Sequence, residues 1–209
     1  GRDGMNVKVP AKADGSYRVE LARDIRYVMM ASAPGFLNQN FELKTSDEEK
    51  DETYYVDFFL SPVDKPVVVE NIFYDFDRAT LRPESKEALD KLIKLLNENP
   101  NVTIELGAHT DRKGSNEYNE GLAQRRAQSV VDYLIGAGID TARLTAKGYG
   151  EMVPKTVTAK LAKKYPFLPE GTVLDETFVN ALPPEEQEVA DQLNRRTEFQ
   201  VTGMDYELK

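Results

Sequence analysis

The sequence from Gly107 to Leu134, GAHTDRKGSNEYNEGLAQRRAQSVVDYL, joins a polar loop to an amphipathic helix and decides the fold of the region around it. At 100° per residue, the apolar side chains of its second half fall within half a turn, which is the pattern of a helix with one buried face. The same half-turn contains Asn119 and Arg126, whereas Arg125 falls on the opposite, solvated side. The apolar residues of the buried face are Leu122, Ala123, Ala127, Val130, Val131 and Leu134.

Arg126 is therefore predicted to differ in role from its neighbour Arg125. A guanidinium at the edge of a buried helix face needs a carboxylate or a ligand beside it, because burial of an unpaired charge is costly. Periodicity by itself allows two interpretations of Arg126, a structural ion pair or a contact to a bound ligand.

Strands and helices alternate along the rest of the second half of the chain. Residues 102–109 alternate apolar and polar side chains, which predicts a strand that buries one face. Helices between strands imply crossover connections and an α/β (α+β) fold, with a βαβαβ-type sheet and helices packed on it. The elements expected are strands at 71–76, 102–109, 144–148 and 197–202, and helices at 83–97, 119–137 and 184–194.

The sequence from Val7 to Leu60 is typical of a small all-β domain. Its β-rich runs are short and are separated by Asp-Gly and Pro-Gly pairs, both of which favour turns. Two prolines near its end disfavour helix and central strand, and they predict a linker at 63–66 between domains at 1–62 and 67–209. The runs expected as strands are 17–21, 27–31, 41–43 and 54–60.

Composition excludes several classes of function. The 209 residues carry a net charge of -9, and a nucleic-acid-binding surface would need clustered Lys and Arg. The absence of cysteine excludes disulfides and thiolate metal sites. No run approaches about 18 apolar residues, so no membrane-spanning helix is expected. The single histidine, His109, is expected to be a polar group at a strand end, and no cofactor is expected.

Several motifs occur together in an order that is typical of one family. Thr110-Asp111-x-x-Gly114 is followed by Asn119-x-x-Leu122-x-x-x-Arg126-Ala127, with Phe76-Asp77 upstream and Asn194-Arg195-Arg196 downstream. The pattern extends from about Val67 to Thr202 and resembles the OmpA-like C-terminal domain, the peptidoglycan-associated module of Gram-negative envelopes. The sequence departs from the family at Ala123, where serine is usual, and by an insertion at 156–191 that resembles the Bacteroidetes version.

The resemblance implies a ligand as well as a fold. Asp77 and Asp111 each follow a predicted strand, and a carboxylate can accept from an ammonium while the Arg126 guanidinium binds a carboxylate in a forked pair. In the family, the corresponding residues hold the free amino acid centre of meso-diaminopimelate in the peptidoglycan stem peptide. The peptidoglycan-binding set carried over from the family is Asp77, Asp111 and Arg126, with Asn119, Thr80 and Leu122 as neighbours.

Other interpretations of these residues stay open. Asp77 and Asp111 could cap turns, with Arg126 neutralising one of them, in a structural module that has no wall ligand. They could also be the acid and base of a peptidoglycan hydrolase, although a neighbouring arginine stabilises ionised carboxylates and leaves no protonated acid near neutral pH. A metal site built from Asp75, Asp77, His109 and Asp111 is a third alternative.

The N-terminal region resembles the carboxypeptidase-regulatory-like β-sandwich, truncated at its opening strands. The resemblance rests on Asp14-Gly15-Ser16-Tyr17 and Ala31-x-Ala33-Pro34-Gly35-Phe36. The two domains together resemble the C-terminal part of a Bacteroidetes outer-membrane lipoprotein associated with type IX secretion. This implies a non-enzymatic, periplasmic, outer-membrane-associated protein that binds peptidoglycan and contacts outer-membrane or secretion proteins, with export and anchoring elements upstream.

The insertion at 156–191 is expected to leave from the periphery of the domain, away from the rim that holds Asp77 and Asp111, and to be dispensable for wall binding. It has too many apolar residues for a solvated loop, so it is expected to pack on its own domain or to offer a surface to a partner. The Asn194-Arg195-Arg196 motif just beyond it is expected to tie the last strand to the sheet edge rather than to bind the ligand.

Overall fold

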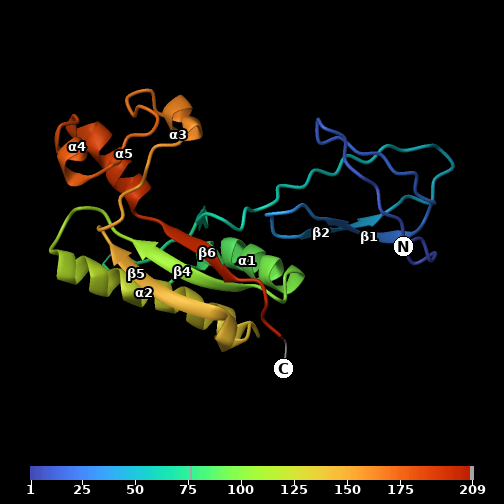
Figure 1. The fold of residues 1–209 in the computed structure, drawn as a ribbon, viewed down its shortest axis with the longest axis horizontal. Helices are drawn as coiled ribbons and strands as arrows, with labels where there is room; N and C mark the ends of the chain where they lie inside the picture. Colours follow the sequence, from blue (N-terminus) through green and yellow to red (C-terminus); the bar gives the residue numbers. More distant parts are fainter. Residues whose placement is uncertain (76, 208–209) are drawn as a thin grey trace. The chain divides into compact units, whose positions relative to one another are not determined.

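The computed structural model describes residues 1–75 and 77–207, and the chain divides into two compact units, Gly1–Ser61 and Pro62–Lys209. Phe76, the last residue of the strand predicted at 71–76, lies outside the described residues, as do residues 208–209. Each unit has its own strands (Figure 1). No helix in the described part of the chain is long and apolar enough to cross a membrane.

The first unit contains one antiparallel two-stranded sheet. β1 (Arg26–Ala31) pairs with β2 (Gln39–Lys44), which confirms two of the predicted strands. The chain reverses between them at Gly35, whose φ of 78° is rarely adopted by residues that have a β-carbon. Among the described residues of this unit, Tyr27 and Leu37 are the buried large apolar side chains.

The other two strands predicted in the first unit are wrong. The runs at 17–21 and 54–60 are not strands, because side-chain bonds rather than a backbone ladder hold them to the rest of the unit. The hydroxyl of Tyr17, for example, donates to the carbonyl of Val56 (2.7 Å). The described residues of this unit therefore form a two-stranded sheet with flanking loops, which has fewer strands than the truncated β-sandwich that the sequence led us to expect.

The second unit is built on a four-stranded mixed sheet in the order β3-β6-β4-β5. β4 (Thr103–His109) and β5 (Leu144–Gly150) are parallel, whereas β6 (Thr197–Gly203) runs antiparallel both to β4 and to β3 (Val67–Val68). A parallel pair needs a crossover connection, and α2 (Asn116–Gly136) supplies most of it. The predicted combination of a sheet with helices packed on it is confirmed.

α2 packs closely on β4 and β5, and its six predicted apolar residues are all buried. Small side chains make the approach possible, because Ala123 and Ala127 lie against Ala108. At Gly148 of β5 a β-carbon would lie only 2.2 Å from the backbone nitrogen of Gln124. A 3-10 turn, η2 (Thr141–Arg143), then leads into β5.

α1 (Lys86–Glu98) follows a 3-10 turn, η1 (Pro83–Ser85), and contacts α2. Together the two elements occupy the predicted helix. The apolar residues of α1 form a stripe, in which Ile93 is only half-buried. The buried members of the stripe are Ala88, Leu89, Leu92 and Leu96.

The strand predicted at 71–76 is wrong over its described residues. Asn71 has a φ of 63°, a left-handed conformation that is incompatible with a continuing strand. The backbone of Phe73 is bound to the start of the next helix, because its N–H donates to Oγ of Ser85 (2.8 Å) and its carbonyl accepts from the N–H of Arg82 (2.9 Å). These bonds replace the ladder bonds that a strand would make, and the edge strand is β3 instead.

The insertion folds around an apolar core of its own. It contains α3 (Ala159–Lys164), α4 (Glu176–Asn180) and most of α5 (Pro184–Asn194), the last at the predicted position. Figure 1 shows the three helices grouped beyond the end of the sheet where β5 ends and β6 begins. The apolar residues of the insertion thus pack within their own domain. The core consists of Val157, Leu168, Leu174, Val179 and Ala190.

Candidate functional site

Asp111, the first predicted site residue, lies in the loop after β4, at the edge of the sheet where the parallel strands end. Its side chain is 12% exposed. Oδ1 accepts the backbone N–H of Lys113 (2.9 Å), which closes a local turn, and Oδ2 accepts from Nη1 of Arg195. Asp111 therefore shapes its own loop and also forms an ion pair.

Asn119 fixes the same loop from the first turns of α2. Its buried side-chain nitrogen donates to the carbonyls of Asp111 (3.3 Å) and Lys113 (3.2 Å), and to Oε2 of Glu151 (2.8 Å). Gly114 packs against this amide with a φ of 116°, and a β-carbon there would lie 3.3 Å from Oδ1 of Asn119. Helix α2 begins three residues earlier than predicted because Oγ of Ser115 accepts the backbone N–H of Tyr118 (3.3 Å).

Arg126 lies about two turns further along α2 and is half-buried, whereas Arg125 is exposed. Its Nε donates to the carbonyl of Arg78 (3.0 Å), and its guanidinium carbon lies 4.8 Å from the ring centroid of Tyr74. In the part of the chain that the structure describes, Arg126 forms no ion pair with a carboxylate, so the structural ion pair allowed by the sequence is not observed. Its charge is stabilised by a ring face and a carbonyl.

Asp77 and Asp111 both act electrostatically on Arg126. Burial is the main cause that lowers the pKa of Arg126, while the nearby Tyr74, Asp77 and Asp111 act to raise it and Arg195 lowers it further. Two carboxylates and two guanidinium groups therefore share one region at the edge of the sheet, on residues far apart in the sequence.

The remaining predicted site residues, Asp77, Thr80 and Leu122, differ in accessibility. Asp77, with a φ of 55°, accepts a hydrogen bond from the hydroxyl of Tyr118, a residue that the sequence did not single out. Thr80 is exposed, and its carbonyl accepts the N–H of Asp75 (3.1 Å). Leu122 is buried on the inner face of α2, so it supports the helix from beneath instead of presenting a surface to a ligand.

The expectation that the insertion stays away from this rim is wrong. Nζ of Lys113 lies 3.0 Å from Oε2 of Glu188 and 3.2 Å from Oδ2 of Asp191, both on α5. The contact arises because β4 ends and β6 begins at the same edge of the sheet, so the loop after β4 and the helix before β6 leave it side by side.

Arg195 is a residue of this region that the sequence placed elsewhere, as a tie for the last strand. It lies directly after α5 and binds Asp111 through Nη1, while its Nη2 donates to Glu188 and to Oε1 of Gln192 (2.8 Å). Burial acts to lower the pKa of Arg195, but its hydrogen bonds to Glu188 and Asp111 outweigh that effect and raise it. One feature of the sequence could have indicated this position. Arg195 comes just before β6, and because β6 runs antiparallel to β4, the start of β6 lies at the edge of the sheet that carries Asp111.

A buried polar network lies beside the loop. His109 ends β4, as predicted, with Nε2 2.9 Å from Oε1 of Glu198 and its ring stacked on that of Tyr149 (centroids 4.9 Å apart). Nε of Arg196 donates to the other oxygen of Glu198 (3.0 Å). Burial lowers the pKa of His109. Burial would raise the pKa of Glu198, but the hydrogen bond from His109 and the charge of Arg196 prevail and lower it to about 2.

The alternative of a metal site has no support in the described residues. They contain no group of three or more His, Cys, Asp or Glu side chains that could hold a metal ion, and the four residues proposed from the sequence form no such group. His109 is engaged by Glu198 rather than by the loop aspartates.

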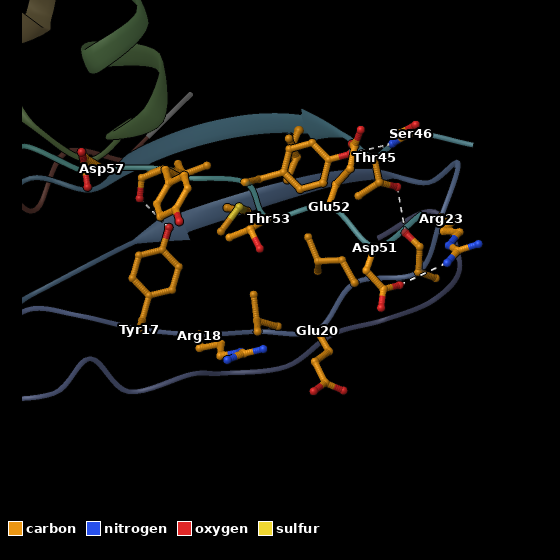
Figure 2. A pocket seen from close by; sticks show the side chains of 18 of the residues that line it. Tyr17, Arg18, Glu20, Arg23, Thr45, Ser46, Asp51, Glu52, Thr53 and Asp57 are labelled. Atoms are coloured by element: carbon orange, nitrogen blue, oxygen red, sulfur yellow. Dashed lines mark hydrogen bonds and ion pairs between the residues drawn. The ribbon is translucent and has the colours of Figure 1, made fainter. Parts of the chain in front are cut away.

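A cleft of about 990 Å³ lies in the first unit, between the runs around 15–23 and 43–57 (Figure 2). Tyr17 lies at one end of it, and the ion pair of Arg23 with Asp51 (3.1 Å) lies at the other.

Residues 73–165 match the OmpA family. This region is similar to an OmpA domain. Over 88 residues the chain is 47% identical to outer membrane protein A of Escherichia fergusonii. The aligned region covers 41% of this chain and 36% of that protein. The outer membrane protein A of Escherichia coli O157:H7 is also 47% identical over 88 residues, and these residues cover 25% of its length. The chain thus spans between a quarter and about a third of the length of these relatives.

Two solved structures are also similar to this chain. The peptidoglycan-associated lipoprotein from Burkholderia pseudomallei is 22% identical, with a TM-score of 0.44, over 63% of this chain and 88% of that chain. The cell wall anchor of the type VI secretion system from Pseudomonas aeruginosa is 22% identical, with a TM-score of 0.44, over 66% of this chain and 79% of that chain.

Proposed function

We propose that the OmpA-like domain binds peptidoglycan non-covalently, through the free amino acid end of meso-diaminopimelate in the stem peptide. The observation that carries this proposal is the state of Arg126, a half-buried guanidinium that lies near Asp77 and Asp111 but forms no ion pair with a carboxylate among the described residues. A half-buried guanidinium in that state favours an anionic ligand, because a ligand carboxylate would supply the opposite charge.

The donors and acceptors at the site suit a zwitterion. In the described part of the chain, Nε is the one guanidinium nitrogen of Arg126 that donates a hydrogen bond, so its terminal nitrogens can bind a ligand carboxylate as a fork. Asp111 is mostly buried and carries two bonds, one on each oxygen. Each carboxylate oxygen can accept a second hydrogen bond, so a ligand ammonium can bind beside Arg195.

The proposed role of the whole protein is to anchor an outer-membrane protein or a secretion assembly to the cell wall from the periplasm. The match of residues 73–165 to the OmpA family supports this role, as does the identity to outer membrane protein A. Attachment through a lipoprotein of the type IX secretion system belongs to the proposal on the strength of the sequence resemblance.

A hydrolase is the competing function, and the geometry favours binding. An acid–base mechanism requires one carboxyl group to remain protonated while a second is ionised. Asp111 is held by Arg195, and Asp77 accepts a hydrogen bond from Tyr118, so both are arranged as acceptors. A binding protein needs both groups in that state.

Co-sedimentation of the 209-residue chain with purified diaminopimelate-type sacculi tests the proposal. We expect the chain to pellet with the sacculi and to be released by a soluble tripeptide that ends in meso-diaminopimelate. Retention in the supernatant would refute peptidoglycan binding, and release of soluble muropeptides from the sacculi would favour the hydrolase.

A further inference from the structure

Side chains of the insertion and of Arg195 hold the loop that carries Asp111 from one side, and the bonds from Asn119 hold it from α2. Three consecutive loop residues, Asp111, Arg112 and Lys113, each bind α5 or the residue that follows it. The ion pairs are complementary, with acids on α5 facing the two loop cations and Arg195 facing the loop acid.

Asp191 is the centre of this contact. It is fully buried, and its two carboxylate oxygens lie 3.2 Å from Nε of Arg112 and 3.2 Å from Nζ of Lys113. A buried carboxylate between two cations fixes the position of both, because moving either cation away would leave an uncompensated charge in a water-poor environment. Arg112 is secured further by Oδ1 of Asn180 (2.7 Å) and Oε1 of Gln187 (2.8 Å).

α5 is itself fixed by the core of the insertion. Ala190, beside Asp191, is fully buried in the cluster that contains Leu168 and Val179. At the end of the helix, the Asn194 side chain accepts the N–H of Lys155 (2.8 Å) and donates to the carbonyl of Leu174 (2.8 Å). An uninterrupted series of packed and hydrogen-bonded groups therefore leads from the apolar core of the insertion to the carboxylate of Asp111.

We propose that α5 of the insertion is part of the ligand site, and that Asp191 is a positioning residue that acts through Arg112 and Lys113 to hold Asp111 where it meets the ligand. The inference rests on the proposed function, since it assigns the insertion a role in that same site. A ligand-binding carboxylate must be held within about half an ångström of its productive position. On the side of α2, the described bonds from a side chain to residues 111–113 come from Asn119.

The test compares two substitutions on one helix. Asp191→Asn removes the buried charge with little change in shape, and Glu185→Gln removes a charge at an exposed position of α5. We expect Asp191→Asn to weaken binding of the diaminopimelate tripeptide about tenfold, as is typical when a supporting group is removed. Glu185→Gln should bind as the unmodified chain does.

Two further measurements separate positioning from general destabilisation. Amide hydrogen exchange at residues 111–114 should accelerate in Asp191→Asn, while exchange in β4 and α1 stays unchanged. In a chain that already carries Asp111→Asn, adding Asp191→Asn should change sacculus binding less than about twofold, because the Asp111 carboxylate that Asp191 positions is already lost. Unchanged affinity in Asp191→Asn, or an effect that adds fully to that of Asp111→Asn, would overturn the inference.

The inference can still be tested if Asp191→Asn misfolds or if the unmodified chain does not bind peptidoglycan. If Asp191→Asn fails to fold by circular dichroism, Glu188→Gln carries the test, because Glu188 is half-exposed and contacts both Lys113 and Arg195. If the unmodified chain binds neither sacculi nor tripeptide, the proposed function fails. The exchange rates at 111–114 then still decide whether α5 holds the loop, and unchanged rates would refute it.

Discussion

Arg195 binds the carboxylate of Asp111 across 84 residues of sequence, and so joins the loop after β4 to the end of α5. The pair matters for a ligand at this edge of the sheet. It keeps Asp111 in a defined position, whereas Arg126 near it forms no ion pair with a carboxylate among the described residues. Arg195 therefore has a structural partner, and Arg126 is the arginine that we propose binds the ligand.

Replacement of Arg126 should abolish wall binding, whereas replacement of Arg125 should not. Arg126→Ala removes the proposed carboxylate-binding group, a change expected to cost about 2–5 kcal/mol of binding free energy, which is roughly 30-fold or more in affinity. Arg125→Ala removes an exposed neighbour of the same charge. Titration calorimetry with the diaminopimelate tripeptide gives both affinities, and equal losses in the two variants would contradict the assignment.

Stem peptides that carry lysine in place of diaminopimelate should bind poorly. Lysine retains the side-chain ammonium but lacks the second carboxylate, so Arg126 would remain unpaired in the complex. We expect an affinity lower by at least about tenfold. Calorimetry with the two tripeptides, matched in all other positions, measures the ratio, and a ratio near one would show that Arg126 does not read the carboxylate.

Acidification should remove a stabilising contribution of Glu198. Its pKa is lowered in the folded chain to about 2 from an ordinary value of 4.5, so the contribution is fully present above pH 4.5 and is lost as the pH falls toward 2. Its size is on the order of 3 kcal/mol. Urea unfolding between pH 7 and pH 3 measures this. The free energy of unfolding of Glu198→Gln should be lower than that of the unmodified chain at pH 7, and the difference should shrink on acidification.

A matched substitution controls for the titration of the other carboxylates. Glu176→Gln changes an exposed glutamate in the first turn of α4, and its difference from the unmodified chain should be small at every pH. A difference for Glu198→Gln that stays constant from pH 7 to pH 3 would show that the network with His109 and Arg196 does not depress the titration of this group.

Two glycine substitutions test the close approach of α2 to β5. In Gly148→Ala the new β-carbon would lie 2.2 Å from the backbone nitrogen of Gln124, so we expect the free energy of unfolding to fall by about 3 kcal/mol or more. Gly136→Ala, at the end of α2, meets nothing within 4 Å and should raise stability by about 0.5–1 kcal/mol. Urea unfolding measures both, and a Gly148→Ala protein of unchanged stability would contradict the packing.

The sequence by itself determined the elements whose pattern is local. The buried face of α2, the apolar stripe of α1 and the limits of α5 all follow from periodicity over a few turns, because the spacing of apolar residues records which face leaves water. The position of Arg126 at the margin of the α2 face was readable in the same way, and it distinguished this arginine from Arg125.

Other elements were decided by partners that periodicity does not record. Residues 71–75 have the composition of a strand, but Ser85 and Arg82 take the backbone hydrogen bonds of Phe73. Residues 17–21 and 54–60 have strand-like sequences without a strand ladder in the described unit. In both cases a β-rich run does not form a strand, because a strand requires a partner strand for its backbone hydrogen bonds as well as β propensity.

The tertiary structure alone decided which charges meet. Asp111 is separated from Arg195 by 84 residues, and nothing local indicates that the buried Asp191 of the insertion faces two cations of the loop that carries Asp111. The antiparallel return of β6 beside β4 brings them to one edge, where burial leaves each charge stable only with an opposite charge beside it. Pattern in the chain specifies which face is buried, whereas the pairing of buried charges is set by the sheet that brings them together.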